Sequence, residues 1–271
     1  MECFKIQNLT FTYPEQEIPV LRNVDLSLHP GDFTVLAGPS GCGKSTLLRQ
    51  LKTVLAPHGS KEGTILFNGT PLETVDERTQ TAKIGFVLQD PDSQIVTDKV
   101  WHELAFGLES LGMDNTTIRG RVAEMASFFG LENWMYQNVS DLSGGQKRRI
   151  AIAGIIAMKP KVLVLDEPCA GLDPEGRELI LSQVKNYQQT TGSTVILVSH
   201  SMEDIANYAD KVLVMEQGRV YNYDTTEKIF RDAENLSRMG LGIPDITKVF
   251  LKLKEMGVDI GTDVYTIPYA V

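Results

Sequence analysis

The amino-acid sequence predicts an α/β fold in which helices cover both faces of a mainly parallel sheet. Apolar runs of strand length recur at 34–37, 64–67, 84–88, 162–165, 195–198 and 212–215. Several of them are apolar at every position, which is typical of strands that are covered on both faces. Longer helical patterns, such as 45–55 and 175–190, lie between them, and this alternation of strands and helices favours an α/β architecture.

The opening segment, about 4–28, has a different pattern. Its apolar residues alternate with polar ones, and a turn-like stretch, Pro14–Glu17, interrupts the alternation. Period-2 alternation around a turn is typical of half-buried antiparallel strands. We therefore expect an antiparallel flank beside the main sheet.

Two later segments depart from the strand–helix alternation. Between about 91 and 155 the strand signals fade and apolar residues recur at helical spacing, which predicts a helical subdomain. Beyond it, Pro244 and Asp245 could begin a helix, and 262–267 predicts a last short strand. One apolar face of that helix would contain Ile246, Val249, Phe250 and Leu253. We expect a main domain over 1–232 and a small α/β C-terminal extension over 233–271.

Composition and charge restrict the function. The chain has 271 residues, with 35 acidic against 26 basic side chains and a formal charge of −9, which disfavours a general nucleic-acid binder. The longest nearly apolar stretch, Ile150–Met158, is far shorter than the about 20 residues that a membrane-spanning helix needs. A membrane role would therefore depend on a partner. The three cysteines lie far apart, which favours a reducing compartment.

A glycine-rich loop follows the expected strand 34–37 and matches G-x-x-x-x-G-K-[ST] in the required strand, loop and helix order. The loop and helix start are Gly38, Pro39, Ser40, Gly41, Cys42, Gly43, Lys44, Ser45 and Thr46. Glycines let backbone N–H groups point at a phosphate, and the helix N-terminus adds its positive end. Lys44 would reach the β and γ phosphates, and Ser45 would bind Mg²⁺. The pattern predicts nucleotide binding; the alternative is a plain glycine-rich turn.

Two acids end the apolar strand 162–165. Carboxylates at the end of a buried strand are costly unless they meet a cation. Asp166 would hold the Mg²⁺ shell, and Glu167 would orient and deprotonate an attacking water. The alternative is that both acids only cap the next turn.

A third motif, Ser143-Gly144-Gly145-Gln146, precedes a helical pattern. Ser143 with Gln146 three residues later is a capping box. A capped helix start with two glycines is also an exposed anion site, so both interpretations can hold at once.

Together the three motifs resemble the ATP-binding-cassette ATPases, and the resemblance covers nearly the whole chain. It implies a P-loop NTPase with a RecA-like core, an antiparallel β flank and a helical subdomain, and it implies ATP and Mg²⁺ as cofactors. By the same resemblance, Tyr13 matches the aromatic that stacks on adenine, and Gln89 the Q-loop glutamine that touches Mg²⁺ and the attacking water. Asp173 matches the D-loop, and His200 the histidine that contacts the γ-phosphate.

The resemblance also implies a mechanism. Two subunits of this family pair head to tail, so that Ser143 and Gly145 of one chain face the nucleotide of the other. Closure on ATP and opening after hydrolysis would be the power stroke. Glu167 would act as the base, while Lys44, Mg²⁺ and His200 would spread the charge that develops on the phosphate.

Segments 90–94 and 100–109 and the tail near 242–260 resemble the ATPases of energy-coupling factor transporters of the cobalt and vitamin type. This implies an importer of a metal ion or vitamin, at the cytoplasmic face of the cell membrane and peripheral to it. The partners would be a second ATPase subunit, identical or related, a membrane T-component and a substrate-binding S-component, with no nucleic acid. The tail would help to hold the ATPase dimer.

Two other functions compete. A soluble cassette ATPase could act on nucleic acid or ribosomes, but the segment between Lys44 and Ser143 is too short for a long coiled-coil insertion, and only one cassette is present. A regulatory module without hydrolysis is disfavoured because Glu167 and His200 are both present. Cys42 and Cys169 are unusual residues in otherwise standard loops. The plain interpretation is that both are small tolerated residues; the alternative for Cys42 is that its place beside a helix N-terminus lowers the thiol pKa.

Overall fold

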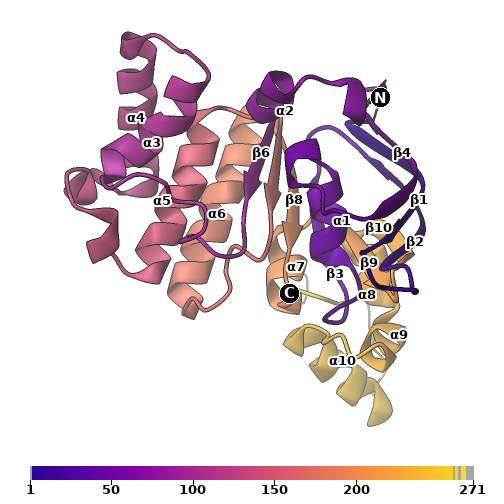
Figure 1. Cartoon of the computed structure of the whole chain (residues 1–271). Coiled ribbons are helices and arrows are strands. Elements are labelled where there is room, and N and C mark those ends of the chain that lie inside the picture. Colours follow the sequence, from indigo (N-terminus) through magenta and orange to yellow (C-terminus); the bar gives the residue numbers. More distant parts are fainter. Residues whose placement is uncertain (1, 259, 262–263, 267–271) are drawn as a thin grey trace. The chain divides into compact units, whose positions relative to one another are not determined.

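The computed structural model describes residues 2–258, 260–261 and 264–266. The chain divides into two compact units, which are described separately below (Figure 1). The first unit combines Met1–Thr74 with Ile196–Val271, and the second is Val75–Val195.

The first unit contains an antiparallel sheet with the strand order β2-β1-β4-β5. Its strands are β1 (Phe4–Thr12), β2 (Leu21–Leu28), β4 (Ser60–Phe67) and β5 (Thr70–Pro71). Phe4 pairs with Leu28 on one side and with Phe67 on the other, which confirms the antiparallel flank. The run 64–67 lies at the end of β4 and belongs to this antiparallel sheet, in which Ile65 and Phe67 are buried and Leu66 is partly exposed.

A second sheet of the first unit has the strand order β10-β9-β3-β8. It is formed by β3 (Phe33–Ala37), β9 (Lys211–Glu216), β10 (Arg219–Thr225) and the last residues of β8 (Thr194–Val198). β3 pairs in parallel with β9, with Val35 opposite Val212, and every residue of β3 is buried. This is the pattern expected of a parallel strand that is covered on both faces.

The helices of the first unit are short. They are α1 (Lys44–Gln50), α7 (Met202–Tyr208), α8 (Thr226–Arg231), α9 (Ala233–Arg238) and α10 (Asp245–Glu255). Short 3₁₀ turns follow at Thr53–Leu55 and Leu72–Thr74. The helical pattern predicted over 45–55 therefore divides into α1 and a 3₁₀ turn.

The C-terminal helix α10 forms where it is predicted, but its apolar face is only partly buried, since Ile246, Phe250 and Leu253 are half-buried. Val249 remains 51% exposed, and the buried residue of α10 is Thr247, whose hydroxyl donates to the Val264 carbonyl at 2.7 Å. The strand predicted over 262–267 falls partly outside the described residues. The described part, 264–266, forms no strand.

The second unit is built on two parallel strands, β6 (Ile84–Val87) and β7 (Val162–Leu165), which are buried at every position. Val87 lies opposite Leu165, so the two strands end side by side. At the start of β8, the Thr194 N–H donates to the Lys161 carbonyl at 2.9 Å.

Helices make up most of the second unit. They are α2 (Glu77–Lys83), α3 (Val100–Ser110), α4 (Asn115–Phe129), α5 (Gly144–Ala157) and α6 (Pro174–Thr191), with 3₁₀ turns at Glu132–Trp134 and Val139–Asp141. α3, α4 and α5 pack against one another (Figure 1). They occupy the segment where the loss of strand signals predicts helices.

Candidate functional site

The glycine-rich loop of the first unit joins β3 to α1, and its path depends on glycine. A Cβ atom at Gly38 would lie 2.5 Å from the Met215 carbonyl oxygen and 2.7 Å from Cys42 Sγ. Gly43, the residue before α1, has a φ of 103°, which side chains disfavour. The path of the loop into α1 therefore requires glycine at both positions.

Lys44 carries the positive charge of this loop. Its Nζ donates to the carbonyls of Gly38 at 2.8 Å and Pro39 at 3.0 Å, and the residue is buried. α1 has no side-chain cap, so the first turn offers backbone N–H groups next to a fixed ammonium group. These donors suit the phosphates of a nucleotide.

Cys42 behaves differently from the expectation. Burial raises the pKa of its thiol, and this outweighs the opposite effects of Lys44 and of backbone hydrogen bonds. The lowered pKa that its place beside a helix N-terminus predicts is therefore wrong. The physical reason is that the thiol is 6% exposed, so that a thiolate would be poorly solvated.

Tyr13 and His200 also lie in the first unit. The Tyr13 hydroxyl is 3.1 Å from Thr46 Oγ1 on α1, and the ring meets Phe11 edge to face. His200 follows Ser199, whose N–H donates to the Leu36 carbonyl at 3.4 Å, just before the glycine-rich loop. The unit thus places an aromatic ring beside α1 and a histidine after the strand next to β3.

The second unit brings Gln89 and Glu167 together. Both follow the paired ends of β6 and β7, and Gln89 Nε2 donates to Glu167 Oε2 at 2.9 Å. Asp166 is 1% exposed, and its N–H donates to the Val87 carbonyl at 3.0 Å. The parallel pairing of β6 with β7 therefore brings Gln89, Asp166 and Glu167 to the carboxyl end of these two strands.

Arg148 contacts both residues of this pair, although no motif in the sequence assigns it a role. Its guanidinium donates from Nη1 to the Glu167 carbonyl at 2.8 Å and from Nη2 to the Gln89 carbonyl at 3.1 Å. The signal that could have found it is helical spacing, since Arg148 lies one turn before the buried Ile152 on the same face of α5.

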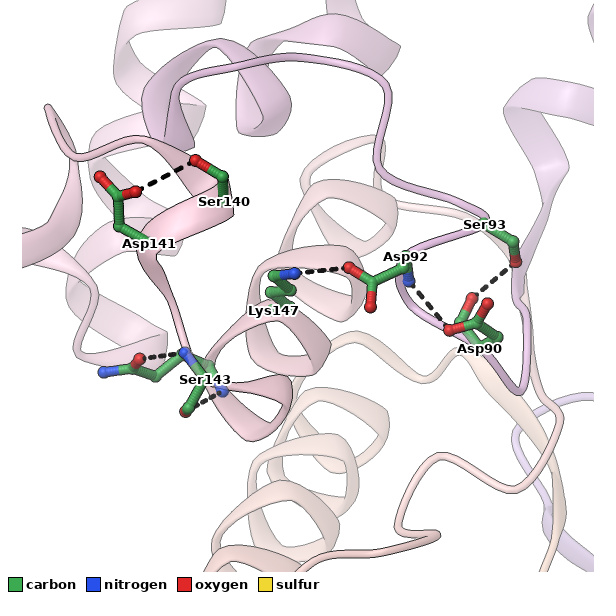
Figure 2. A network of polar contacts seen from close by, with 8 residues as sticks. Asp90, Asp92, Ser93, Ser140, Asp141, Ser143 and Lys147 are labelled. Carbon is green, nitrogen blue, oxygen red and sulfur yellow. Dashed lines mark hydrogen bonds and ion pairs between the residues drawn. The ribbon is translucent and has the colours of Figure 1, made fainter.

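The motif from Ser143 to Gln146 forms the start of α5. The Ser143 N–H donates to Gln146 Oε1 at 2.8 Å, and Ser143 Oγ accepts from the Gln146 N–H, so the predicted capping box is confirmed (Figure 2). Ser143, Gly145 and Gln146 line an open pocket of about 450 Å³ together with Asp173. Asp173 itself caps α6, since its carboxylate accepts from the Gly176 N–H at 2.8 Å.

The loop after Gln89 is tied to the same helix start. Asp90 accepts hydrogen bonds from the Asp92 N–H and the Ser93 hydroxyl, and the Asp92 carboxylate meets Lys147 Nζ at 2.6 Å (Figure 2). This loop is therefore compact and anchored to the first turns of α5.

The predicted site residues are thus divided between the units. Tyr13, the glycine-rich loop and His200 lie in the first, and Gln89, Asp166, Glu167, the start of α5 and Asp173 lie in the second. Across the described residues, no cluster of three or more His, Cys, Asp or Glu side chains could hold a metal ion. In the same part of the chain no helix is long and apolar enough to cross a membrane.

Comparison with known proteins agrees with these motifs. The family model described as ABC transporter matches residues 21–170. A protein of Clostridium acetobutylicum named energy-coupling factor transporter ATP-binding protein EcfA2 is 40% identical over 98% of this chain and 94% of its own length. A protein of the same name from Caldanaerobacter subterraneus is 39% identical, with the same coverage of 98% and 94%.

Solved structures show the same relationship. cbiO1 of Clostridium perfringens, described as part of the ABC transporter complex cbiONQ, matches with a TM-score of 0.76 and 32% identity over 94% of this chain and 97% of that one. A dimeric ATP-binding cassette in a post-hydrolysis state, bound to ADP and Pi, matches with a TM-score of 0.73 and 27% identity over 82% of this chain and 98% of that one. The chain therefore belongs to the ABC transporter family and is an ATPase of that family.

Proposed function

We propose that this chain binds and hydrolyses ATP to power an importer of the energy-coupling factor type, with a metal ion or vitamin as the cargo. The observation that carries the proposal is the contact between Gln89 and Glu167 at the ends of two buried parallel strands. The names of the relatives, which are energy-coupling factor ATP-binding proteins, support this type of transporter.

The residues of the glycine-rich loop would hold the nucleotide. Lys44 and the N–H groups of the first turn of α1 would bind the phosphates, and Tyr13 would stack on the adenine. Glu167 would take a proton from the attacking water, and His200 would contact the γ-phosphate.

Mg²⁺ fits the donors that the chain offers. The hydroxyl of Ser45, the amide of Gln89 and the carboxylate of Asp166 are oxygen ligands of the kind that Mg²⁺ prefers, and phosphates and water complete such sites. When bound, Mg²⁺ would neutralise charge on the phosphates.

A second ATPase subunit, identical or related, would complete the site. In a head-to-tail dimer the pocket lined by Ser143, Gly145 and Asp173 would face the nucleotide of the partner. The extension 233–271 would stabilise this dimer. The exposed Val249 on the apolar face of α10 supports this role, because such a face gains stability when a second copy covers it.

Membrane partners would bind beside the loop that follows Gln89. Val96, Trp101 and Tyr136 are 62%, 41% and 83% exposed. The Trp101 N–H donates to the Met135 carbonyl at 3.0 Å, so the backbone of Trp101 lies next to the residue that precedes Tyr136. A T-component helix would cover this surface, an S-component would bind the cargo, and the ATPase would be peripheral at the cytoplasmic face of the membrane.

The test is an affinity pull-down from detergent-solubilised membranes, with phosphate release measured on the captured complex. We expect a hydrophobic membrane protein and a substrate-binding membrane protein to co-purify, and their presence to raise ATP turnover. Co-sedimentation with ribosomes or DNA and no membrane partner would contradict the proposal. In a variant that carries both Val96→Asp and Tyr136→Asp, the membrane partners should no longer co-purify, while the basal ATPase activity should be unchanged.

A further inference from the structure

Arg148 is a buried cation that connects three elements of the second unit. It is 9% exposed, and burial lowers the pKa of its guanidinium, while Cys169, Asp90 and Glu167 act in the opposite direction. A guanidinium at such a site is costly unless its donors are satisfied. Here two of them bind the carbonyls of Glu167 and Gln89 at 2.8 and 3.1 Å.

These two carbonyls belong to Glu167 and Gln89, whose side chains are hydrogen-bonded to each other and form the hydrolytic pair of the proposed function. Glu167 has a φ of 49°, in the left-handed region that residues other than glycine rarely adopt. Two donors hold its carbonyl, the Arg148 guanidinium and the Ala170 N–H at 3.2 Å. Arg148 therefore holds the backbone of Glu167, which sets the direction of the Glu167 carboxylate. It also holds the backbone of Gln89, the hydrogen-bond partner of that carboxylate.

The same helix carries the capped motif at its start. α5 begins directly after Ser143, and Arg148 lies little more than one turn further on. The adjacent Lys147 binds Asp92 in the loop after Gln89 (Figure 2). Backbone hydrogen bonds connect the successive turns of α5, so a displacement of its Ser143 end that carries the first turns with it would also displace the Arg148 guanidinium.

We propose that Arg148 is a positioning residue that aligns Gln89 and Glu167 and makes their alignment depend on the position of the Ser143 end of α5. This inference rests on the proposed function, in which Ser143 faces the nucleotide of the partner. Each chain would then hydrolyse its own ATP fastest when its α5 is engaged by the partner's nucleotide, and the two sites of the dimer would be coupled.

The first test compares two Arg→Lys variants of the full-length chain. Arg121 on α4 also donates to a backbone carbonyl of α5, that of Ala157 at 3.2 Å, but at the opposite end of the helix. We expect Arg148→Lys to lower kcat about tenfold or more, to leave the Kd for ATP within about twofold, and to bring the Hill coefficient for ATP toward one. Arg121→Lys should keep all three values. Equal effects of the two variants, or an equal loss of ATP binding, would overturn the proposal.

A double-mutant cycle then asks whether Arg148 acts through Glu167. In a Glu167→Gln background, Arg148→Lys should cause little further loss of kcat, because the carboxylate that it aligns is gone. A loss by the same factor as in the unmodified chain would show that Arg148 acts elsewhere.

A third measurement does not depend on turnover. Hydrogen exchange of the segment 88–94 should become severalfold faster in Arg148→Lys and stay unchanged in Arg121→Lys, because the Gln89 carbonyl loses its donor in the first variant only. Unchanged exchange in both variants would overturn the positioning role. A wild-type chain without ATPase activity would overturn the proposed function, and the exchange result would still decide the role of Arg148 in holding this loop.

Discussion

The glycine-rich loop of the first unit and the Gln89–Glu167 pair of the second unit are positioned by different kinds of interaction. The loop is fixed by backbone: a Cβ at Gly38 would clash with the Met215 carbonyl, and Lys44 is held by loop carbonyls. The pair is fixed by side chains, through the amide of Gln89 and the guanidinium of Arg148. The glycine-rich loop has no room for a Cβ at Gly38. The Gln89–Glu167 pair depends instead on several side-chain hydrogen bonds, each of which can be removed separately.

The largest effect on ATP hydrolysis is expected when Glu167, the proposed base, is replaced. Glu167→Gln keeps the shape of the side chain and removes the proton acceptor, so phosphate release should fall by about 10²–10⁴-fold while ATP still binds. Size-exclusion chromatography with ATP and Mg²⁺ should show a stable closed dimer. Full turnover by this variant would remove Glu167 from the mechanism.

The next largest effect is expected on ATP binding, when a methyl group is added to Gly38 in the glycine-rich loop. Gly38→Ala places a Cβ 2.5 Å from a backbone oxygen, so the loop must shift and the affinity for ATP should fall about tenfold or more. Gly120→Ala on α4, where a Cβ meets nothing within 4 Å, is the matched control and should bind ATP normally. Titration with a fluorescent ATP analogue measures both variants, and equal affinities would show that the loop tolerates the extra carbon.

The two regions also differ in how far the sequence predicts them. The glycine-rich loop is a continuous motif, so its residues and their order in strand, loop and helix are predictable from local spacing alone. The contact of Gln89 with Glu167 requires the pairing of β6 with β7, and the two residues are far apart in the sequence. Arg148 was missed for the same reason, because its carbonyl partners belong to two other elements.

Burial accounts for two further differences. The run 64–67 resembles a core strand in composition, yet it pairs with β1 and is buried only at alternate positions. The position of Cys42 beside a helix N-terminus suggests a reactive thiol, but desolvation raises its pKa. Neither solvent exposure nor strand partner is contained in a local pattern. This is why the pKa direction predicted for Cys42 is wrong and why the sheet to which 64–67 belongs cannot be assigned from composition.

A moderate effect on ATP binding is expected from alkylation of the Cys42 thiol in the glycine-rich loop. Because burial raises the pKa of Cys42 above the ordinary value, little thiolate exists near neutral pH, and alkylation should be slow there and faster as the pH rises. Modification should block ATP binding, and bound Mg-ATP should protect. Mass spectrometry of the labelled peptide measures the rate, with Cys42→Ser as the control. Unchanged ATPase activity after stoichiometric modification of Cys42 would contradict this prediction.

The smallest effect is expected at the ion pair between Lys147 and Asp92. Its distance of 2.6 Å is short, but the Asp92 side chain is 65% exposed, and such pairs contribute about 0–1 kcal/mol. Lys147→Met should therefore change kcat by no more than about fivefold, and added salt should reduce the difference from the unmodified chain. The comparison with Arg148→Lys separates the two neighbours on α5. If Lys147→Met had the larger effect, the exposed ion pair and not the buried guanidinium would be the connection that aligns the hydrolytic pair.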